Sequence, residues 1–441
     1  MKYNSAVLIY AQAEELGTVK TQLWQPPLGL MSIATYVQQR SPGFDIQVLN
    51  QELESDQQQI EEINSEVVGI SAGLLNYQRA INLAEHFKKK GAVVVFGGPY
   101  PSVIPEAILD NKKCVDYVVR GEGEEPFYQF LSGVPIDEID GFVHRTENGL
   151  RVSSPKISRI NQLPLIDRSI VDMEEYFSNW RKIFPESPFA NPTTIYSQSG
   201  CTWRNVKRSC IFCARTDLSW EGREPEKVWE EIRGLVDNYG VDYVRDLADS
   251  FSQHLGWLRA FTEQKPENIN IPFRIWARSN QVNKRTIDYL AQLNVHDVFL
   301  GTESGDLGCL ERMQKGITPE DNVNAVRLLN EYGMKTFISF VLGLPGESEE
   351  SLENTLRHIE TLVKIGNVET MVSQVLKPLP GSKAFSMLVE KTGEKYLGLD
   401  EFDVEELRQD WVRLFCDVDY DQLQQVNHKI QEFDVPMKYH K

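Results

Sequence analysis

Residues 200–213 read Gly-Cys-Thr-Trp-Arg-Asn-Val-Lys-Arg-Ser-Cys-Ile-Phe-Cys and hold three of the six cysteines of the chain. Thiolates are soft ligands, and iron–sulfur clusters are held mainly by them. Three thiolates on a four-iron cluster leave one iron open to an external ligand, which makes this stretch a candidate reactive centre. A three-cysteine zinc site or buried thiols are the alternatives. No Cys or His follows Cys213 at zinc-ligand spacing, since the next histidine is His254.

The segments around this stretch alternate between apolar, strand-like runs and amphipathic helical patterns. A strand predicted at 193–197 leads into the cysteines. Further strands are expected at 241–247, 273–278, 297–300, 336–342 and 371–376, and helices at 225–238, 284–293, 319–332 and 351–365. About six strand–helix units predict a complete or partial parallel barrel, in which chemistry occurs at the carboxyl ends of the strands. The cysteine stretch is expected on that face, because it follows the first strand.

The N-terminal part of the chain shows the same rhythm. Short apolar runs predict strands at 6–10, 46–49, 67–71, 92–96 and 115–119, and helical patterns at 28–39 and 77–90 lie between them. Alternating strands and helices predict a doubly wound α/β domain whose parallel sheet is covered on both faces. Open sheets of this kind bind ligands outside the carboxyl ends of their strands.

Three loops rich in small residues follow strands of this first sheet. They contain Ser71, then Gly97, Gly98 and Pro99, and finally Gly121 and Glu122. Glycine lets the backbone approach a ligand closely, although each loop alone is equally well explained as a tight turn. Three such loops on one sheet edge favour a large ligand lying across it. No G-x-G-x-x-G motif opens a helix after the first strand, which disfavours a dinucleotide.

Composition restricts the class of protein. A chain of 441 residues is suited to two or three domains, and a net charge of −18 argues against general binding to nucleic acid. Neither an apolar run of membrane-spanning length nor a signal peptide is present in the sequence, so we expect no membrane span and a cytoplasmic location. Six scattered cysteines fit a reducing compartment better than a disulfide framework.

The remaining segments are predicted to connect the two domains and to cover the barrel. Residues 136–190 are interpreted as a connector with a β-hairpin at Asn148-Gly149, which places His144 at the surface. Residues 386–441 are acidic and helical in pattern, and they are expected to form a small C-terminal region over the barrel. Cys416 in that region is interpreted as a small buried residue, with a proton-donating or ligating role as the alternative.

The first domain, roughly residues 1–135, resembles the cobalamin-binding domain that precedes many radical SAM enzymes. The resemblance rests on Pro26-Pro27-Leu28-Gly29-Leu30, on Gly97-Gly98-Pro99 and on Gly121-Glu122-Gly123-Glu124. The Asp-x-His-x-x-Gly signature of other cobalamin proteins is absent after the first strand. The resemblance therefore implies cobalamin without a protein histidine on the lower cobalt face, with the dimethylbenzimidazole tail near Ser71, Gly97 and Gly98.

Residues 191–385 resemble the partial (β/α)6 barrel of the radical SAM superfamily. Cys210-Ile211-Phe212-Cys213 matches its cluster motif, and three further matches follow in the family's order: Gly301-Thr302-Glu303-Ser304-Gly305, Gly343-Leu344-Pro345-Gly346-Glu347 and Leu379-Pro380-Gly381-Ser382. The first two cysteines are separated by eight residues, where the family has three. A longer loop must therefore close around the cluster, at little extra entropic cost. Its charges, on Arg204, Lys207 and Arg208, are interpreted as tuning the cluster, as meeting a partner or substrate, or as a solvated surface.

The resemblance implies a [4Fe–4S] cluster held by Cys201, Cys210 and Cys213, with S-adenosylmethionine (SAM) on the open iron. Glu303 and Ser304 become candidates for the SAM amino group or ribose, and Phe212, Gly343 and Pro345 for other contacts with the cofactor. Arg278 is suited to hold a carboxylate bidentately, unless it pairs with Glu303. Asp246 and Asp249 lie at the end of the second barrel strand, where they contact substrate or SAM, or where Asp249 caps a helix. Glu303, Arg278 and Asp249 are the predicted catalytic residues.

Cobalamin together with a radical SAM centre implies methyl transfer. The expected activity is a C-methyltransferase that acts on an unactivated carbon of a small metabolite through a 5′-deoxyadenosyl radical and methylcobalamin. A radical cyclase or rearrangement enzyme is the first alternative, and a non-catalytic corrinoid sensor with a structural metal is the second. The expected partners are a small-molecule substrate and an electron donor such as flavodoxin or ferredoxin, with no nucleic acid.

Overall fold

The computed structural model describes residues 1–13, 23–156, 159–205, 208–215 and 219–433. The described chain forms two compact units. The first contains residues 1–183 together with 398–401, and the second contains most of the chain from residue 184 onward. Lys207, one of the three basic residues of the cysteine loop, lies outside the described residues.

The first unit is built on a seven-stranded sheet with the order β2-β1-β3-β4-β5-β6-β7. Its strands are β1 (Ser5–Tyr10), β2 (Asp45–Asn50), β3 (Val67–Ser71), β4 (Val93–Gly97), β5 (Tyr117–Val119), β6 (Phe142–Thr146) and β7 (Gly149–Val152). The first five are parallel, and β6 and β7 add as an antiparallel edge. The predicted doubly wound α/β architecture is confirmed.

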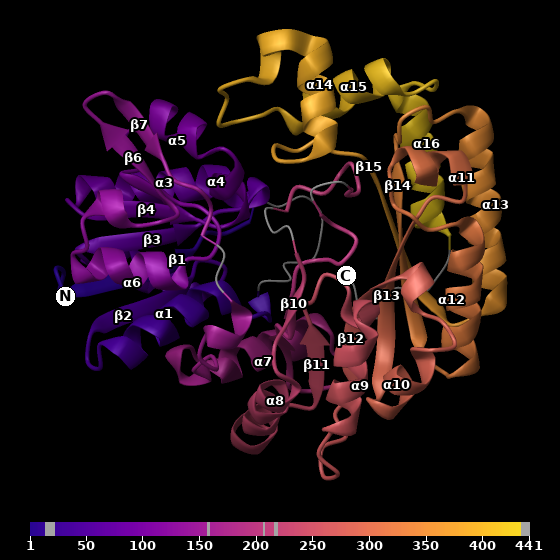
Figure 1. Ribbon diagram of the computed structural model, residues 1–441, viewed down its shortest axis with the longest axis horizontal. Coiled ribbons are helices and arrows are strands. Elements are labelled where there is room, and N and C mark those ends of the chain that lie inside the picture. Colours follow the sequence, from indigo (N-terminus) through magenta and orange to yellow (C-terminus); the bar gives the residue numbers. More distant parts are fainter. Residues whose placement is uncertain (14–22, 157–158, 206–207, 216–218, 434–441) are drawn as a thin grey trace. The chain divides into compact units, whose positions relative to one another are not determined.

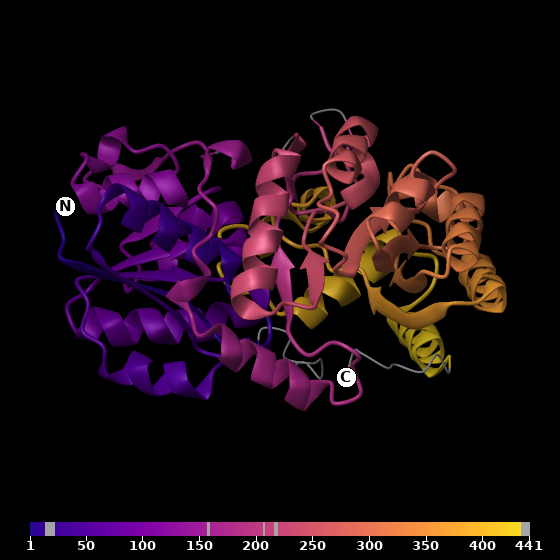
Figure 2. The same ribbon diagram turned by 90° about the horizontal axis from the view of Figure 1, so that it is seen from below.

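Helices cover both faces of this sheet (Figures 1 and 2). They are α1 (Leu28–Arg40), α2 (Glu54–Glu62), α3 (Tyr77–Lys89), α4 (Pro99–Val103), α5 (Pro105–Asn111), α6 (Glu124–Ser132) and α7 (Met173–Ile183). The central strands are apolar throughout because both faces are covered, and Val7, Val68 and Val94 are fully buried. The carboxyl ends of β3, β4 and β5 carry the small-residue loops.

The predicted hairpin forms, but it belongs to the first sheet. β6 pairs with β5, and β7 pairs with β6. The prediction that His144 lies at the surface is wrong: the residue is 6% exposed, and its Nε2 lies 3.2 Å from Oδ1 of Asp137. His144 is covered because the hairpin continues the sheet instead of standing free.

A short C-terminal segment, Gly398–Glu401, is part of the first unit. The hydroxyl of Tyr77 donates to Oδ2 of Asp400 at 2.8 Å, and the hydroxyl of Tyr100 donates to the Asp400 carbonyl at 3.0 Å. Tyr100 lies in α4, directly after the Gly97–Gly98 turn. The loop after β4 is therefore fixed by a segment three hundred residues away in sequence.

The second unit is a six-stranded, all-parallel sheet with the order β15-β14-β13-β12-β11-β8. Its strands are β8 (Pro192–Ile195), β11 (Tyr243–Asp246), β12 (Phe273–Arg278), β13 (Val295–Glu303), β14 (Lys335–Leu342) and β15 (Val368–Val375). The sheet curves, with helices on its outer side (Figure 1). This is the predicted partial barrel.

The helices of the second unit include the four that the sequence predicts and the expected C-terminal helices, together with two that it does not predict, at 255–263 and 307–312. They are α8 (Pro225–Tyr239), α9 (Leu255–Glu263), α10 (Ile287–Gln292), α11 (Leu307–Arg312), α12 (Pro319–Glu331), α13 (Glu349–Ile365), α14 (Lys383–Thr392), α15 (Val404–Phe415) and α16 (Tyr420–Glu432). Thr318 caps α12 by accepting from the backbone N–H of Asp321 at 3.1 Å, as the Thr-Pro start predicts.

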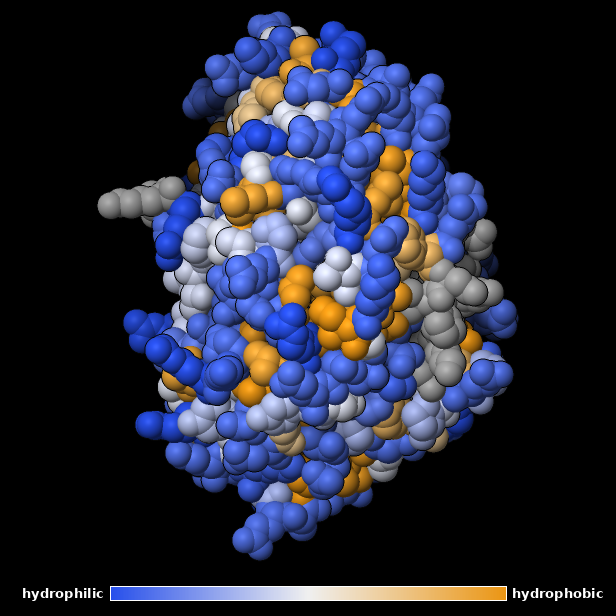
Figure 3. Space-filling view, turned by 90° about the vertical axis from the view of Figure 1, so that its right-hand side faces the viewer, coloured by the Kyte–Doolittle hydropathy of each residue, from blue (hydrophilic) through white to orange (hydrophobic). Residues whose placement is uncertain are grey.

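The outward surface of the covering helices is mainly hydrophilic. Figure 3 shows the side on which the later helices of the second unit lie, and apolar residues form only small patches there. Among the described residues, no helix has both the length and the apolar character needed to cross a bilayer.

Candidate functional site

The cysteine segment leaves and re-enters the second unit through a two-strand base. β9 (Gln198–Ser199) pairs antiparallel with β10 (Glu221–Gly222). The cysteine segment is also bonded to the segments that follow β13 and β15, because the N–H of Ile211 donates to the Met313 carbonyl at 3.0 Å. The Ile211 carbonyl in turn accepts from the N–H of Ala384 at 2.9 Å. The segment therefore lies at the carboxyl ends of the strands, as the sequence predicts.

All six cysteines lie within the described residues, and all have free thiols. Cys210 is buried, whereas Cys201 and Cys213 are half-buried. Nη1 of Arg278 lies 3.9 Å from Sγ of Cys210, and Nη1 of Arg204 lies 4.0 Å from Sγ of Cys213. Burial raises the pKa of the Cys210 thiol, and nearby Lys315 and Arg278 oppose that rise.

This donor set fits an iron–sulfur cluster chemically, because three unpaired thiols share one loop and two have guanidinium N–H donors beside them. Such donors stabilise sulfur that carries negative charge. Within the described ranges, no three His, Cys, Asp or Glu side chains converge closely enough to hold a single metal ion. The assignment of Cys201, Cys210 and Cys213 as cluster ligands therefore stays a prediction.

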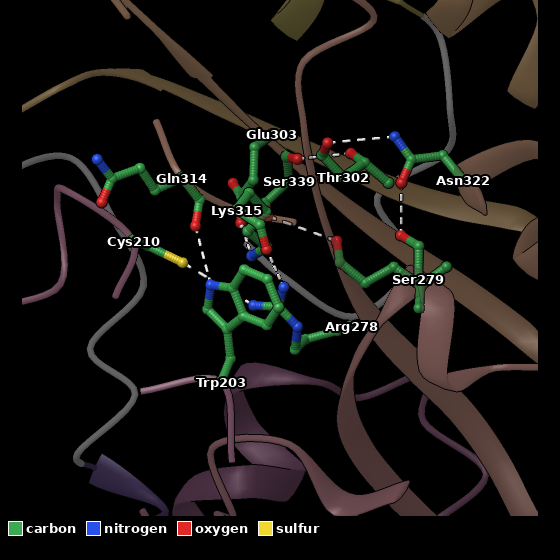
Figure 4. A network of polar contacts seen from close by, with 11 residues as sticks. Trp203, Cys210, Arg278, Ser279, Thr302, Glu303, Gln314, Lys315, Asn322 and Ser339 are labelled. Carbon is green, nitrogen blue, oxygen red and sulfur yellow. Dashed lines mark hydrogen bonds and ion pairs between the residues drawn. The ribbon is translucent and has the colours of Figure 1, made fainter. Parts of the chain in front are cut away.

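Trp203 anchors the eight-residue loop between the first two cysteines (Figure 4). Its indole Nε1 donates to the Gln314 carbonyl at 2.8 Å. A Cβ added at Gly316 would lie 2.1 Å from Cη2 of Trp203, so the ring occupies the space that the glycine leaves. The guanidinium carbons of Arg208 and Arg278 lie 4.3 and 4.8 Å from the ring centre. The long loop is thus packed against the segment that follows α11.

Glu303 ends β13 in a strained conformation, with φ at 62°. Its Oε1 lies 2.6 Å from Nζ of Lys315, and both side chains are nearly buried. A Cβ at Gly301 would fall 2.6 Å from that oxygen and 2.7 Å from the ammonium. Glycine at this position makes room for the ion pair.

The polar contacts of Arg278 differ from the predicted carboxylate clamp. Its Nη2 donates to the Lys315 carbonyl, while Nη1 faces Cys210. Glu303 pairs with Lys315 rather than with Arg278, which corrects the pairing considered from the sequence. In this structure Arg278 connects the cysteine loop to the segment after α11 (Figure 4).

Ser304 and the two aspartates after β11 occupy different environments. Ser304 is 1% exposed, and its hydroxyl lies 3.1 Å from the hydroxyl of Thr355 in α13. Asp246 is fully buried, and its Oδ1 accepts from the N–H of Ala248 at 2.9 Å. Burial raises the pKa of Asp246 to about 6. Asp249 is half-buried, and its contact with substrate or SAM stays a prediction.

The loop after β14 is bound tightly by its own unit. Nε1 of Trp411 donates to the Gly343 carbonyl at 2.7 Å, and Arg312 donates to the Pro345 carbonyl. Oε2 of Glu347 accepts from the N–H groups of Gly343 and Leu344 at 2.7 and 3.0 Å. Burial raises the pKa of Glu347 to about 7. These contacts explain the loop structurally, and a role for Gly343 and Pro345 in binding SAM stays a prediction.

Phe212 lies near Lys315, and Cys416 lies near the loop after β14. The ring of Phe212 is half-buried, with Nζ of Lys315 5.8 Å from its centre. Sγ of Cys416 lies 3.5 Å from the Leu344 carbonyl, and burial raises the pKa of this thiol far above its usual value. A protonated, half-buried thiol is what the structural interpretation of Cys416 predicts.

At the sheet edge of the first unit, the glycines have two different roles. Gly98 has φ at 101°, and a Cβ there would lie 2.7 Å from the Ala72 carbonyl. Gly121 has φ at 80°, and a Cβ there would lie 2.2 Å from the Lys156 carbonyl. Both are therefore required by backbone packing between loops. At Gly97, by contrast, no described atom lies within 4 Å of an added Cβ, so this glycine presents open backbone beside Ser71.

The other two predicted residues of this edge are positioned by local structure. Pro99 begins α4, where its fixed φ suits the first turn. Glu122 is exposed, and its backbone N–H donates to the Lys156 carbonyl at 2.9 Å. The edge fits a large planar ligand at Gly97, since backbone is accessible there. Contacts of Ser71, Pro99 and Glu122 with cobalamin stay predictions.

Two residues of the site received no role from the sequence. Trp203 lies inside the quoted cysteine stretch, and Lys315 lies twelve residues after Glu303. The one available signal was Gly316, because a glycine can mark a place where another group approaches the backbone closely, but it does not identify Trp203 as that group.

Comparison with known proteins gives a consistent result. Residues 195–359 match the radical SAM superfamily, and residues 16–131 match the B12 binding domain. An uncharacterized methyltransferase of Pyrococcus horikoshii is 27% identical over 85% of this chain and 82% of its own length. An anaerobic magnesium-protoporphyrin IX monomethyl ester cyclase of Rubrivivax gelatinosus is 24% identical over 86% of this chain and 68% of its own.

A solved structure shares the fold. The radical SAM methyltransferase TsrM of Kitasatospora setae, bound to its tryptophan substrate and a SAM analogue, aligns with a TM-score of 0.72 at 19% identity. The alignment covers 89% of this chain and 77% of that chain.

Proposed function

Because the chain belongs to the radical SAM enzymes that carry a B12-binding domain, we propose that it is a C-methyltransferase acting on an unactivated carbon of a small molecule. Its cofactors are a [4Fe–4S] cluster, SAM and cobalamin. The observation that carries the proposal is that both domains lie on one chain, which aligns over 85% of its length with a relative named as a methyltransferase.

The cysteine loop is the proposed place of the cluster. Cys201, Cys210 and Cys213 supply the thiolates, and Arg204 and Arg278 place N–H donors beside two of the sulfurs. When bound, the reduced cluster supplies the electron that cleaves SAM, and cobalamin supplies the methyl carrier. The protein binds, orients and excludes water around these groups.

Glu303 is the proposed partner of the SAM amino group. Its carboxylate is held at a strand end by a strained backbone and by the ammonium of Lys315, 2.6 Å away. A carboxylate fixed by one cation keeps further acceptor positions for a second one. Arg278 is proposed to act on the cysteine loop, since its contacts are made there.

The edge of the first sheet is the proposed place of cobalamin. Gly97 offers accessible backbone beside Ser71, while Gly98 and Gly121 shape the loops on either side. A flavodoxin or ferredoxin is the proposed electron donor.

Radical cyclisation or rearrangement is the second candidate activity. The relative from Rubrivivax gelatinosus is named as a cyclase and aligns with 86% of this chain. Both activities need the same cluster and SAM, but only methyl transfer also moves a SAM-derived methyl group into the product.

Anaerobic reconstitution with methyl-deuterated SAM, cobalamin, a one-electron reductant for the cluster and a cellular metabolite extract tests the proposal. We expect 5′-deoxyadenosine and a product that carries the deuterated methyl group, detected by untargeted mass spectrometry. Cys210→Ala should abolish both, whereas Cys114→Ala, a half-buried cysteine of the other unit, should leave them intact. Formation of 5′-deoxyadenosine without any labelled product would favour cyclisation or rearrangement. SAM left intact by the reconstituted wild type would contradict both activities.

A further inference from the structure

One face of the barrel strands carries aromatic and charged side chains. On the opposite face, helices pack: the rings of Trp229 in α8 and Phe261 in α9 lie 6.0 and 6.3 Å from the ring of Phe273. Side chains alternate along a strand, so Arg274 and Trp276 of β12 belong to the face turned away from these helices.

Three half-buried side chains form a row across neighbouring strands of this face. The guanidinium carbon of Arg245 in β11 lies 4.4 Å from the ring centre of Trp276 in β12. The ring of Phe299 in β13 lies 6.2 Å from that of Trp276, tilted by 36°. Strand register pairs Trp276 with Phe299 directly. We call these three residues the Arg–Trp–Phe row.

A buried ionic layer closes the face on the amino-terminal side of the row. Nε of Arg274 lies 3.2 Å from Oδ1 of Asp297, and the hydroxyl of Tyr243 donates to Oδ2 of Asp297 at 2.6 Å. The guanidinium carbon of Arg274 lies 4.0 Å from the ring centre of Phe337. Arg274 and Asp297 are 5% and 3% exposed, so this layer is sealed where the row is not.

Along their strands, the residues of the row lie only a few residues before the site at the strand ends. Trp276 precedes Arg278 by two residues, and Phe299 precedes Glu303 by four. At about 3.3 Å per residue, Trp276 stands about 7 Å along its strand from Arg278. A molecule resting on the row would therefore extend toward the carboxylate and guanidinium of that site.

We propose that the Arg–Trp–Phe row is the substrate platform, and that it takes a planar, apolar small molecule bearing a carboxylate. The inference rests on the proposed function, because it concerns the substrate of the same barrel. Half-buried aromatic rings give a flat apolar ligand a surface to stack on. Arg245 supplies the coplanar N–H donors that match a carboxylate.

The surroundings of Arg245 keep its guanidinium group positively charged. Burial and neighbouring Arg274 lower the pKa of Arg245 to about 9, which still leaves the guanidinium cationic at neutral pH. The indole face of Trp276 stabilises that cation. Val372, 40% exposed on the same face of β15, extends the apolar surface.

Cinnamate and its neutral amide, cinnamamide, are matched probes for this platform. Isothermal titration calorimetry on the reconstituted full-length protein should show cinnamate binding about tenfold more tightly than cinnamamide. Arg245→Gln should remove the difference and keep the affinity for cinnamamide. Trp276→Leu should weaken both probes. Arg259→Gln, which alters an exposed arginine of α9, should change neither.

A second variant avoids the risk of misfolding. Val372→Glu places a carboxylate at an exposed position of the same face, and it should weaken cinnamate alone. Equal affinities in the wild type, binding of neither probe, or a preference for cinnamate that survives Arg245→Gln would overturn the platform. The assay needs no SAM cleavage: loss of the preference with 5′-deoxyadenosine still formed refutes only the platform, whereas an intact preference without SAM cleavage refutes only the proposed function.

Discussion

The loops that follow the strands of the two sheets are held in place by different kinds of contact. In the first unit, Gly98 and Gly121 let the backbone of one loop contact the backbone of another. In the second unit, the loops are held by side chains, with Trp203 packed on Gly316 and Lys315 paired with Glu303. Both sets of loops follow parallel strands.

The difference fits the two ligand sites proposed above. Backbone packing gives a smooth edge that suits a large ligand bound over many small contacts. Side-chain packing places charges and sulfur at defined positions, which chemistry on a small substrate requires. Substitutions can therefore break one edge without the other.

Lys315→Met should have the largest effect on stability. Removal of the ammonium leaves the buried carboxylate of Glu303 unpaired, which costs about 3–5 kcal/mol. Lys335→Met is the matched control, because its ion pair with Glu369 is 3.9 Å long and partly exposed, and such pairs contribute about 1 kcal/mol or less. Chemical denaturation of both variants checks this. Equal losses would show that the Glu303–Lys315 pair is not a buried structural element.

Glycine substitutions separate packing from ligand contact at the first edge. Gly121→Ala forces a Cβ to 2.2 Å from the Lys156 carbonyl in a left-handed conformation, and it should cost about 3 kcal/mol. Gly97→Ala meets no described atom, so the unfolding temperature should stay unchanged while the affinity for cobalamin falls. Thermal unfolding and equilibrium dialysis measure the two quantities. Unchanged cobalamin affinity in Gly97→Ala would remove that residue from the ligand site.

We expect a smaller effect on stability from the contact between Trp203 and Gly316, which anchors the cysteine loop, and this effect depends on both residues. Gly316→Ala and Gly333→Ala impose the same backbone strain, with φ at 67° and 70°, but only the first collides with Trp203. Gly316→Ala should therefore lose about 2 kcal/mol more than Gly333→Ala. Adding Trp203→Ala to Gly316→Ala should remove this excess. An excess that persists in the double variant would mean that the indole is not what fills the space.

Glu347 predicts a pH dependence of stability at the second edge. Burial raises its pKa from 4.5 to about 7, so the folded state binds the proton more tightly than the unfolded state. The stability from this group is complete below pH 4.5 and is lost as the pH rises through 7. Glu347→Gln should therefore gain stability relative to the wild type across that window. A parallel pH profile for the two proteins would contradict the assignment.

Strand–helix alternation and apolar periodicity were sufficient to predict the parallel strands of both sheets, but not the antiparallel edge that β6 and β7 add to the first. Val67–Ser71 and Phe273–Arg278 form strands with the predicted bounds, because continuous apolar runs between helices have few other solutions. The position of the cysteine loop also followed from order alone. The contacts between side chains could not be predicted in this way, because they join residues that are far apart in the sequence.

The partner of Glu303 shows this limit most clearly. Arg278 and Lys315 are equally plausible cations in sequence, and only the fold selects Lys315. The prediction that His144 lies at the surface was wrong for a related reason, because the hairpin is covered only when β6 pairs with β5. The role of Trp203 required knowing that Gly316 lies opposite it.

Everything proposed for the second unit depends on Cys201, Cys210 and Cys213 together holding one iron–sulfur cluster at its strand ends. Iron content and electron paramagnetic resonance of the anaerobically reconstituted, reduced protein test it most directly, with and without SAM. We expect about four irons per chain, a signal that changes when SAM is added, and loss of both in each single Cys→Ala variant but not in Cys114→Ala. A full cluster in any of the three variants, or a spectrum insensitive to SAM, would contradict it.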